Sequence, residues 1–205
     1  MIRNIVFDMG NVLIRFDRDL FITRLDIDGG DKELLKREVF RSLEWARMDR
    51  GSMTDAEAAE SVCRRLPERL HDAAAKLVAM WDRPILPIPG MYELVEELKA
   101  NGYGIFLLSN ASYRQHDYWP RIEASRFFDG TLISADEKVV KPQPEIYRLM
   151  LQRFGLTAEE CFFIDDVPSN IEGAFYCGIP GAVFHGDAVL LRRALRSAGV
   201  NVREE

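Results

Sequence analysis

The sequence predicts a doubly wound α/β fold, in which a parallel sheet carries an inserted, all-helical cap subdomain. Residues 1–15 and 87–205 contain short apolar runs that alternate with amphipathic segments of helical period. Such runs are typical of strands buried on both faces of a parallel sheet, and their alternation with helices indicates the doubly wound arrangement. Residues 16–86 interrupt the alternation and show only helical periodicity. We therefore expect an α/β core formed by 1–15 and 87–205, with a helical cap at 16–86.

Five segments are expected to form the strands. Each is a nearly continuous apolar run bounded by turn residues, as expected for a buried parallel strand. In chain order they are "NIVFD" ending at Asp8, "GYGIFLLSN" ending near Asn110, "GTLISA" ending near Ala135, "CFFIDD" ending at Asp165 and "GAVFH" ending near His185.

Three helices are expected between these strands. The segment "GMYELVEELKANG" places Leu94, Val95 and Leu98 on one face, and the glycine near its end suits a C-terminal stop. The segment "PEIYRLMLQRFG" begins with Pro144 and ends with Gly155, which is the usual asymmetry of helix ends. The third segment is "PSNIEGAFYCG".

Three more amphipathic helices are expected in the cap, over "DKELLKREVFRSLEWARM", "TDAEAAESVCRRL" and "PERLHDAAAKLVAMW". Thr54 followed by Glu57 is a capping-box pattern at the start of the second helix. Apolar residues from Leu70 to Trp81 line one face of the third at helical spacing.

The composition excludes several classes of function. The 205 residues include 47% hydrophobic and 29% charged residues, with a formal net charge of −6 and interleaved acids and bases. A nucleic-acid surface would need a basic stripe, and a membrane span would need an apolar run of about 20 residues. We expect neither kind of partner. The start of the chain lacks the apolar region of a signal peptide, and the scattered Cys63, Cys161 and Cys177 suit reduced thiols. We therefore expect a cytoplasmic protein, and the sequence assigns no oligomeric state.

Polar side chains stand where three of the expected strands end. They are Asp8 after the first strand, Ser109 and Asn110 after the second, and Asp165 and Asp166 after the fourth. Lys141 stands just before a helix. Any one of these residues alone is typical of a cap or a turn. Because the carboxyl ends of parallel strands meet at one edge of a sheet, we expect all of them to converge on a ligand site there.

Four segments in this order resemble the successive motifs of the haloacid dehalogenase-like hydrolase superfamily. They are "VFDMGNVL", "LLSN", "KPQPEIY" and "FFIDDVPSNIEGA". The resemblance spans nearly the whole chain, and the helical insert stands where that family often carries a cap. It implies a Rossmann-like core and the phosphatase branch of the family. The first motif and "SNASYRQHDYWP" are most similar to the α-D-glucose-1-phosphate phosphatase-like group.

The resemblance implies a phosphomonoesterase that acts on small phosphorylated metabolites, with sugar phosphates as one candidate class. Asp8 would attack phosphorus and form an aspartyl-phosphate, which water then hydrolyses. Ser109 and Asn110 would bind phosphoryl oxygens. Lys141 would pair with the phosphoryl group and keep Asp8 ionised.

The same resemblance implies a Mg²⁺ cofactor. Its ligands would be Asp8, the backbone carbonyl of Gly10 and Asp165, with Asp166 as a further ligand or as the partner of one. The residue types give separate support, because adjacent acids such as Asp165 and Asp166 would repel each other at a strand end without a cation.

Position 10 departs from the family's pattern. Most phosphatases of the superfamily have a second aspartate there, which protonates the leaving oxygen and later activates water. Gly10 has no such group, and Asn11 cannot replace it because an amide does not titrate. A general acid typically contributes about 10²–10⁴-fold in rate. We therefore expect either a substrate whose leaving group departs easily, such as an anomeric or acyl phosphate, or low activity. His116 is one alternative proton donor.

Two other functions stay open. A catalytically weak member that binds a phosphorylated ligand or a partner would explain Gly10, but it would have no need for Asp8, Lys141 and Asp165. A 2-haloacid dehalogenase is disfavoured, because that chemistry is metal-free and needs no acid pair.

In the cap, "EWARMDRGSMT" is the stretch expected to face the substrate, through Arg47, Arg50 and the flexible Gly51. We favour the alternative, in which Trp45 belongs to the cap core and the arginines lie in solvent. We therefore assign no cap residue to the site.

Overall fold

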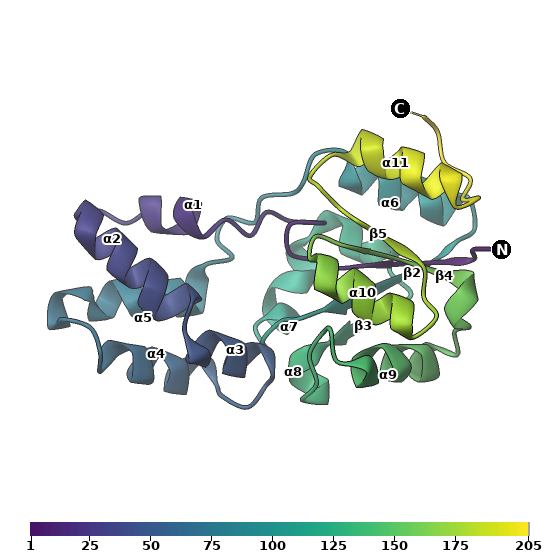
Figure 1. Ribbon diagram of the computed structural model, residues 1–205. Coiled ribbons are helices and arrows are strands. Elements are labelled where there is room, and N and C mark those ends of the chain that lie inside the picture. The colour runs from purple at the N-terminus through teal and green to yellow at the C-terminus, as the bar shows by residue number, and fades with distance from the viewer. Residues whose placement is uncertain (205) are drawn as a thin grey trace.

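The computed structural model describes residues 1–204 and contains a five-stranded parallel sheet. The strand order is β3-β2-β1-β4-β5 (Figure 1). The first strand is central, β2 and β3 lie on one side of it, and β4 and β5 lie on the other. This arrangement confirms the doubly wound α/β fold. The strands are β1 (Asn4–Phe7), β2 (Gly104–Ser109), β3 (Gly130–Ile133), β4 (Cys161–Asp165) and β5 (Gly181–Val183).

Helices cover both faces of the sheet (Figure 1). Ile5 and Phe7 of β1 belong to a hydrophobic cluster shared with α6 and α11, whereas Val6 belongs to a second cluster shared with α9 and α10. Successive side chains of a strand point to opposite faces, so one short strand supplies both clusters. These four helices are α6 (Met91–Ala100), α9 (Pro144–Phe154), α10 (Pro168–Tyr176) and α11 (Ala188–Ser197).

Short helical segments connect the main elements. Helix α8 begins at Ser134, so β3 ends two residues earlier than the expected Ala135. The segments are α7 (Gln115–Tyr118), η3 (Trp119–Arg121), η4 (Glu123–Phe127), α8 (Ser134–Glu137) and η5 (Ala158–Glu160).

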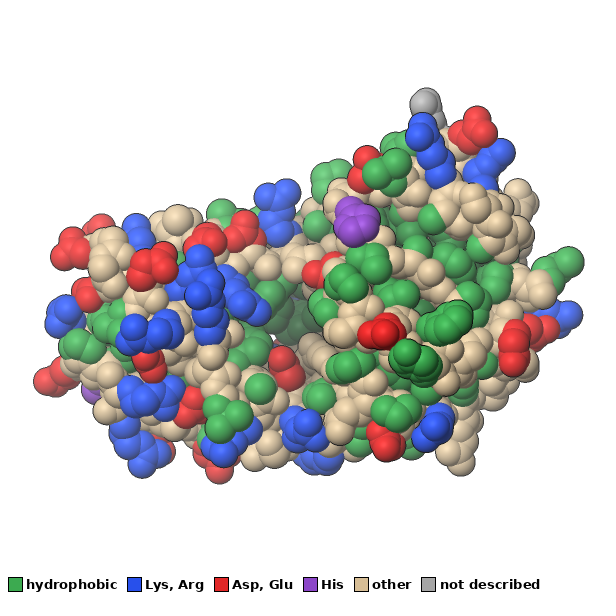
Figure 2. Space-filling view, viewed as in Figure 1, with side chains coloured by type: hydrophobic (Ala, Val, Ile, Leu, Met, Phe, Trp, Pro, Cys, Tyr) green, Lys and Arg blue, Asp and Glu red, His purple; other side chains and the backbone are tan. Residues whose placement is uncertain are grey.

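The chain between β1 and α6 forms a lobe of helices beside the sheet, and a hollow separates the two parts on the surface (Figures 1 and 2). We call residues 18–80 the helical lobe. Its helices are α1 (Arg18–Thr23), α2 (Gly29–Leu35), the π-helix η1 (Lys36–Phe40), α3 (Leu43–Asp49), α4 (Asp55–Cys63), η2 (Glu68–Leu70) and α5 (His71–Met80). Within residues 1–204, the helices are too short or too polar to cross a bilayer.

The expected single helix over "DKELLKREVFRSLEWARM" is wrong, because Ser42 divides it. Ser42 has an extended backbone, and its Oγ accepts a hydrogen bond from the N–H of Trp45 at 3.1 Å, which caps α3. By contrast, the capping box at Thr54 and Glu57 is confirmed at the start of α4.

An ion pair between the buried Glu44 and the exposed Arg65 inside the lobe gives a stability prediction. The Glu44 carboxylate is 7% exposed and accepts hydrogen bonds from Nη1 and Nη2 of Arg65, at 2.7 and 3.0 Å, and from the Ser61 hydroxyl at 2.8 Å. These bonds, chiefly those from Arg65, lower the pKa of Glu44 to about 2. We expect Glu44→Ala to lower the free energy of unfolding by about 1–2 kcal/mol in urea denaturation at pH 7.

Because the pKa of Glu44 is lowered on folding, this contribution is present above its ordinary value of 4.5 and is lost as the pH falls toward 2. The matched control is Glu60→Ala, which removes an exposed partner of Arg64 and should change stability by less than about 0.5 kcal/mol. Equal effects of the two substitutions would contradict the prediction.

Candidate active site

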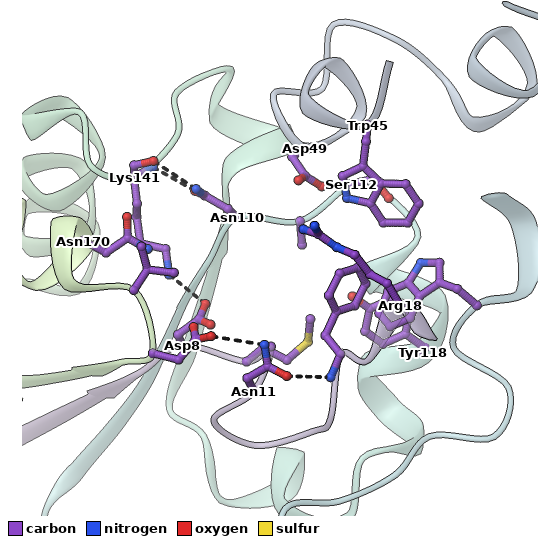
Figure 3. Close-up of a pocket in the computed structure, with 17 residues that line it drawn as sticks. Asp8, Asn11, Arg18, Trp45, Asp49, Asn110, Ser112, Tyr118, Lys141 and Asn170 are labelled. Carbon is purple, nitrogen blue, oxygen red and sulfur yellow. Dashed lines mark hydrogen bonds and ion pairs between the residues drawn. The ribbon is translucent and has the colours of Figure 1, made fainter. Parts of the chain in front are cut away.

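A cavity of about 260 Å³ lies between the carboxyl ends of the central strands and the helical lobe (Figure 3). This is the edge at which open α/β sheets bind ligands. Its core side is lined by Asp8, Gly10, Asn110, Lys141 and Asp166, and its lobe side by Arg18, Trp45 and Asp49.

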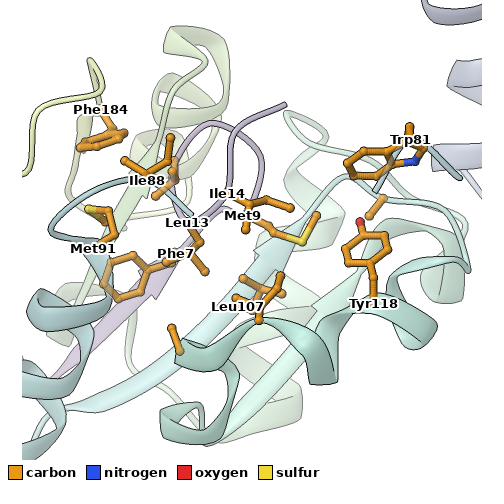
Figure 4. Close-up of a cluster of buried hydrophobic side chains, with 14 of the residues drawn as sticks. Phe7, Met9, Leu13, Ile14, Trp81, Ile88, Met91, Leu107, Tyr118 and Phe184 are labelled. Carbon is orange, nitrogen blue, oxygen red and sulfur yellow. The ribbon is translucent and has the colours of Figure 1, made fainter. Parts of the chain in front are cut away.

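The lobe is held over this edge by apolar packing. Trp81, which follows α5, lies 5.2 Å from Tyr118 and 4.9 Å from Phe16 between ring centroids. Figure 4 shows Trp81 and Tyr118 beside Met9 and Ile14 in the cluster that continues into the sheet. The hydrophobic core is therefore continuous from the sheet to the wall of the cavity.

Lys141 is the electrostatic centre of the core side. Its Nζ donates hydrogen bonds to Asp8 Oδ1 at 2.7 Å, to Asp165 Oδ2 at 2.6 Å and to the carbonyl of Leu108 at 2.8 Å. Burial alone would lower the pKa of Lys141, but the charges of Asp8 and Asp165 and their hydrogen bonds raise it above its ordinary value. The group is therefore an ammonium ion.

Asp8 follows β1 directly and is buried. Burial raises its pKa to about 7, Lys141 opposes that rise, and the charges of Asp165 and Asp166 add to it. The single ammonium group thus leaves an excess of negative charge among these acids. A bound cation would lower the pKa of Asp8 again.

The three acids form a group that fits a divalent cation. Asp8, Asp165 and Asp166 each offer a carboxylate oxygen, and these oxygens lie within 4.8 Å of one another. Such an all-oxygen donor set is the kind that Mg²⁺ prefers, since it needs only one or two carboxylates together with waters. The chemistry of the donors and the uncompensated negative charge both favour a metal at this position.

Asparagine side chains hold two of these acids. Asn170, in the first turn of α10, donates from Nδ2 to both carboxylate oxygens of Asp165 at 3.0 Å. Asn11 donates to Asp166 Oδ2 at 3.1 Å and accepts from the N–H of Phe16 at 2.9 Å, with a left-handed backbone at φ 56°. No pattern in the sequence predicts this function for either asparagine.

Asn110 and Ser109 differ in their placement. Asn110 lines the cavity, but its amide donates to the carbonyl of Lys141 at 3.0 Å and accepts from its N–H at 2.8 Å, so it positions Lys141. Ser109 ends β2, is 1% exposed and is not among the residues that line the cavity. Its expected bond to a phosphoryl oxygen stays a prediction.

The lobe contributes residues that the sequence did not assign to the site. Arg47 and Arg50 are exposed and do not line the cavity, which confirms the alternative that the two arginines lie in solvent. Trp45 and Asp49 of the same stretch do line it. They are four residues apart, one turn along α3, and therefore share a face of that helix. His116 is exposed, lies 3.1 Å from Asp136 and is also outside the cavity lining.

A family model for haloacid dehalogenase-like hydrolases matches residues 2–178. The chain belongs to the haloacid dehalogenase-like hydrolase family. The resemblance read from the four motifs is thus confirmed at the level of the family, and the protein is a hydrolase of this class. The narrower resemblance to the α-D-glucose-1-phosphate phosphatase-like group stays a prediction.

The relatives of this hydrolase include one named as a hydrolase and several named as phosphatases. A chloroplast flavin mononucleotide hydrolase of Arabidopsis thaliana is 30% identical over 56% of this chain and 46% of its own length. A sesquiterpene phosphatase of Aspergillus oryzae is 25% identical over 86% of each chain. A phosphorylated carbohydrates phosphatase of Thermotoga maritima is 29% identical over 44% of this chain and 43% of its own. The chain therefore spans about half the length of two of these relatives.

Solved structures of the family have the same fold as this hydrolase. A family enzyme from Bacteroides thetaiotaomicron, solved as a magnesium complex, is 25% identical with a TM-score of 0.67, over 90% of this chain and 94% of that one. The L-2-haloacid dehalogenase of Xanthobacter autotrophicus is 19% identical with a TM-score of 0.65, over 95% and 83% of the two chains. At that identity the likeness concerns the fold alone.

Proposed function

We propose that this hydrolase is a Mg²⁺-dependent phosphomonoesterase for small phosphorylated metabolites. One observation carries the proposal: the Lys141 ammonium lies between Asp8 and Asp165, with Asp166 beside them, at the core side of the cavity. A phosphate ester repels an anionic nucleophile, so its hydrolysis needs both a carboxylate and concentrated positive charge at one point. The phosphatase names among the relatives support the same function.

In this proposal Asp8 is the nucleophile. Its carboxylate oxygen attacks phosphorus, the bond to the leaving oxygen breaks, and the resulting aspartyl-phosphate is hydrolysed by water. Lys141 stabilises the charge on the phosphoryl oxygens, and Asn110 fixes the position of Lys141. The proposed function of Ser109 is to donate a hydrogen bond to the same oxygens.

The metal site of the proposal consists of Asp8, Asp165, Asp166 and the carbonyl of Gly10. Bound Mg²⁺ would neutralise charge on the phosphoryl group and on the attacking carboxylate. Asn11 and Asn170 orient the acids for it, because each donates an amide hydrogen bond to one of them.

We further propose that residues 16–86 act as a cap that encloses the substrate. The cavity of about 260 Å³ is smaller than the ~300–1,000 Å³ typical of sites for drug-sized ligands, so we infer a substrate with only a few carbons beyond the phosphate, such as a sugar monophosphate. Trp45, Trp81 and Tyr118 offer apolar surface to the non-phosphate part. A closed cap would also exclude water from the phosphoryl group.

Phosphate release with and without the metal tests this function. The panel contains glucose 1-phosphate, acetyl phosphate, glucose 6-phosphate and 4-nitrophenyl phosphate. We expect release in Mg²⁺ and a fall of at least about 100-fold after chelation with EDTA, since a metal supplies several kcal/mol to such a transition state.

Two other outcomes would contradict the proposal. Binding of a sugar phosphate by calorimetry without any phosphate release would favour a binding protein. Metal-independent release of chloride from 2-chloropropionate would favour the dehalogenase chemistry of some structural relatives.

A further inference from the structure

The glycine at position 10 leaves the proposed reaction without a proton donor in the loop that follows β1. When an oxygen leaves phosphorus it takes the bonding electrons and needs a proton, unless it is a very stable anion. Attacking and leaving oxygens lie roughly in line through phosphorus. A donor must therefore reach an oxygen on the far side of the phosphoryl group from Asp8, and the helical lobe bounds the cavity on that side.

Asp49 lies on that side. It is the last residue of α3, and its side chain lines the cavity between Trp45 and Arg18. Figure 3 shows Asp8 projecting from the sheet and Asp49 projecting from the lobe across the cavity, with the Arg18 guanidinium near Asp49. Among the residues that line the cavity, Asp49 is the carboxyl group contributed by the lobe.

The backbone around Asp49 is attached to the core. Its carbonyl accepts a hydrogen bond from Ser134 Oγ at 2.5 Å, and Ser134 Oγ in turn accepts from the N–H of Ala111 at 2.9 Å. The carbonyl of Gly51 accepts a hydrogen bond from Lys138 Nζ. These bonds fix the end of α3 against the elements that follow β2 and β3.

Gly51 permits this close attachment. Its φ is +70°, and a Cβ added there would lie 2.1 Å from the carbonyl oxygen of Ala135. Only glycine allows both the backbone conformation and the approach. The expected flexible Gly51 is thus a docking point between lobe and core, and it places Asp49 over the strand ends.

The surroundings of Asp49 suit a proton donor. Burial raises its pKa to about 7, the Arg18 guanidinium opposes this, and the charge of Asp8 adds to it. The aromatic side chains of Trp45 and Tyr118 line the same cavity. A carboxyl group with a pKa near neutrality can give up its proton and take one back afterwards.

Other groups are less suited to the task. Asp166 belongs to the acid cluster, and Lys141 is held between two carboxylates. Burial raises the pKa of the Tyr118 phenol well above its ordinary value, so it cannot exchange a proton readily at neutral pH. His116 bonds Asp136 outside the cavity.

We propose that Asp49 is the general acid of the reaction and replaces the missing acid at position 10; this inference rests on the proposed phosphatase function. As the Asp8 oxygen bonds to phosphorus, the bond from phosphorus to the leaving oxygen breaks, and that oxygen takes both the electron pair and the proton of Asp49. Water then attacks from the same side and gives its proton to the Asp49 carboxylate. Asp8 is released, and inorganic phosphate is formed.

The test compares two esters of nearly equal shape, phenyl phosphate and 4-nitrophenyl phosphate, in Mg²⁺. Phenoxide is a poor leaving group that needs a proton, whereas 4-nitrophenoxide leaves without one. We expect Asp49→Asn to lower kcat/KM for phenyl phosphate by about 10²–10⁴-fold, but that for 4-nitrophenyl phosphate by less than about 10-fold. The ratio kcat/KM reports only the steps up to cleavage of the ester, so the later hydrolysis does not obscure the comparison.

Asp49→Glu keeps a carboxyl group and should retain more phenyl phosphate activity than Asp49→Asn. Arg47→Ala changes an exposed residue of the same helix and should leave kcat/KM for both esters unchanged. Equal losses of Asp49→Asn on the two esters, or no loss on either, would overturn the proposal, since a residue that only shapes the cavity cannot distinguish leaving groups. If the wild type hydrolyses neither ester nor any phosphate in the panel, the phosphatase function itself fails.

Discussion

Asp8→Asn should abolish the hydrolysis of every phosphate ester while the protein stays folded, with kcat falling by about 10⁴-fold or more. The amide has the shape of the carboxylate but lacks a lone pair basic enough to attack phosphorus. Lys141 keeps its bonds to Asp165 and to the carbonyl of Leu108, so its position should persist. Removing one acid from an excess of negative charge should also leave the metal-free protein at least as stable as the wild type.

Besides the rate, the phosphorylated enzyme intermediate can be measured directly by mass spectrometry. Acid-quenched wild type should carry the mass of one phosphoryl group during turnover, and Asp8→Asn should not. Asp26→Asn, a substitution at an exposed acid of the helical lobe, is the matched control and should behave as the wild type does. Activity of Asp8→Asn near the wild-type level, with no contaminating phosphatase, would contradict the covalent mechanism.

The sheet was predictable from sequence because its central strands β1, β2 and β4 are buried on both faces and therefore consist of apolar runs. The helix ends that were predicted have a residue that terminates the helix locally, such as Gly155, which follows α9 at φ 64°. Two helices were missed although an aspartate caps each of them. Helix α1 is short, and the Asp17 side chain accepts a hydrogen bond from the N–H of Leu20 at its start. At the start of α11 the Asp187 carboxylate caps the N–H groups of Val189 and Leu190.

The core half of the site was predictable for a geometric reason: parallel strands bring their carboxyl ends to one edge. Asp8, Asn110 and Asp166 line one cavity there, although they are far apart in the sequence. The lobe half was not predictable, because the position of Asp49 depends on how the end of α3 docks on the core. That contact uses the Ser134 hydroxyl and a close approach at Gly51, and neither has a recognisable pattern in a single sequence.

Gly10→Asp should restore a proton donor when Asp49 has lost its own. A Cβ at position 10 would lie 3.8 Å from Phe16 Cβ and 3.9 Å from Asp8 Oδ2, which are ordinary van der Waals distances. Space for a Cβ therefore exists at position 10, so the surroundings do not require a glycine there. In the Asp49→Asn background we expect Gly10→Asp to raise kcat/KM for phenyl phosphate by about 10²-fold or more.

In the wild-type background the same substitution should give less than about a 10-fold gain, because the proton is already supplied by Asp49. The two substitutions would thus be strongly non-additive, although they lie on different parts of the chain, since both act on the same leaving oxygen. Gly10→Asn in the Asp49→Asn background is the control and should restore nothing, because an amide does not titrate. An equal gain from Gly10→Asp in both backgrounds would mean that the wild type lacks a general acid altogether, and that Asp49 serves only to shape the cavity.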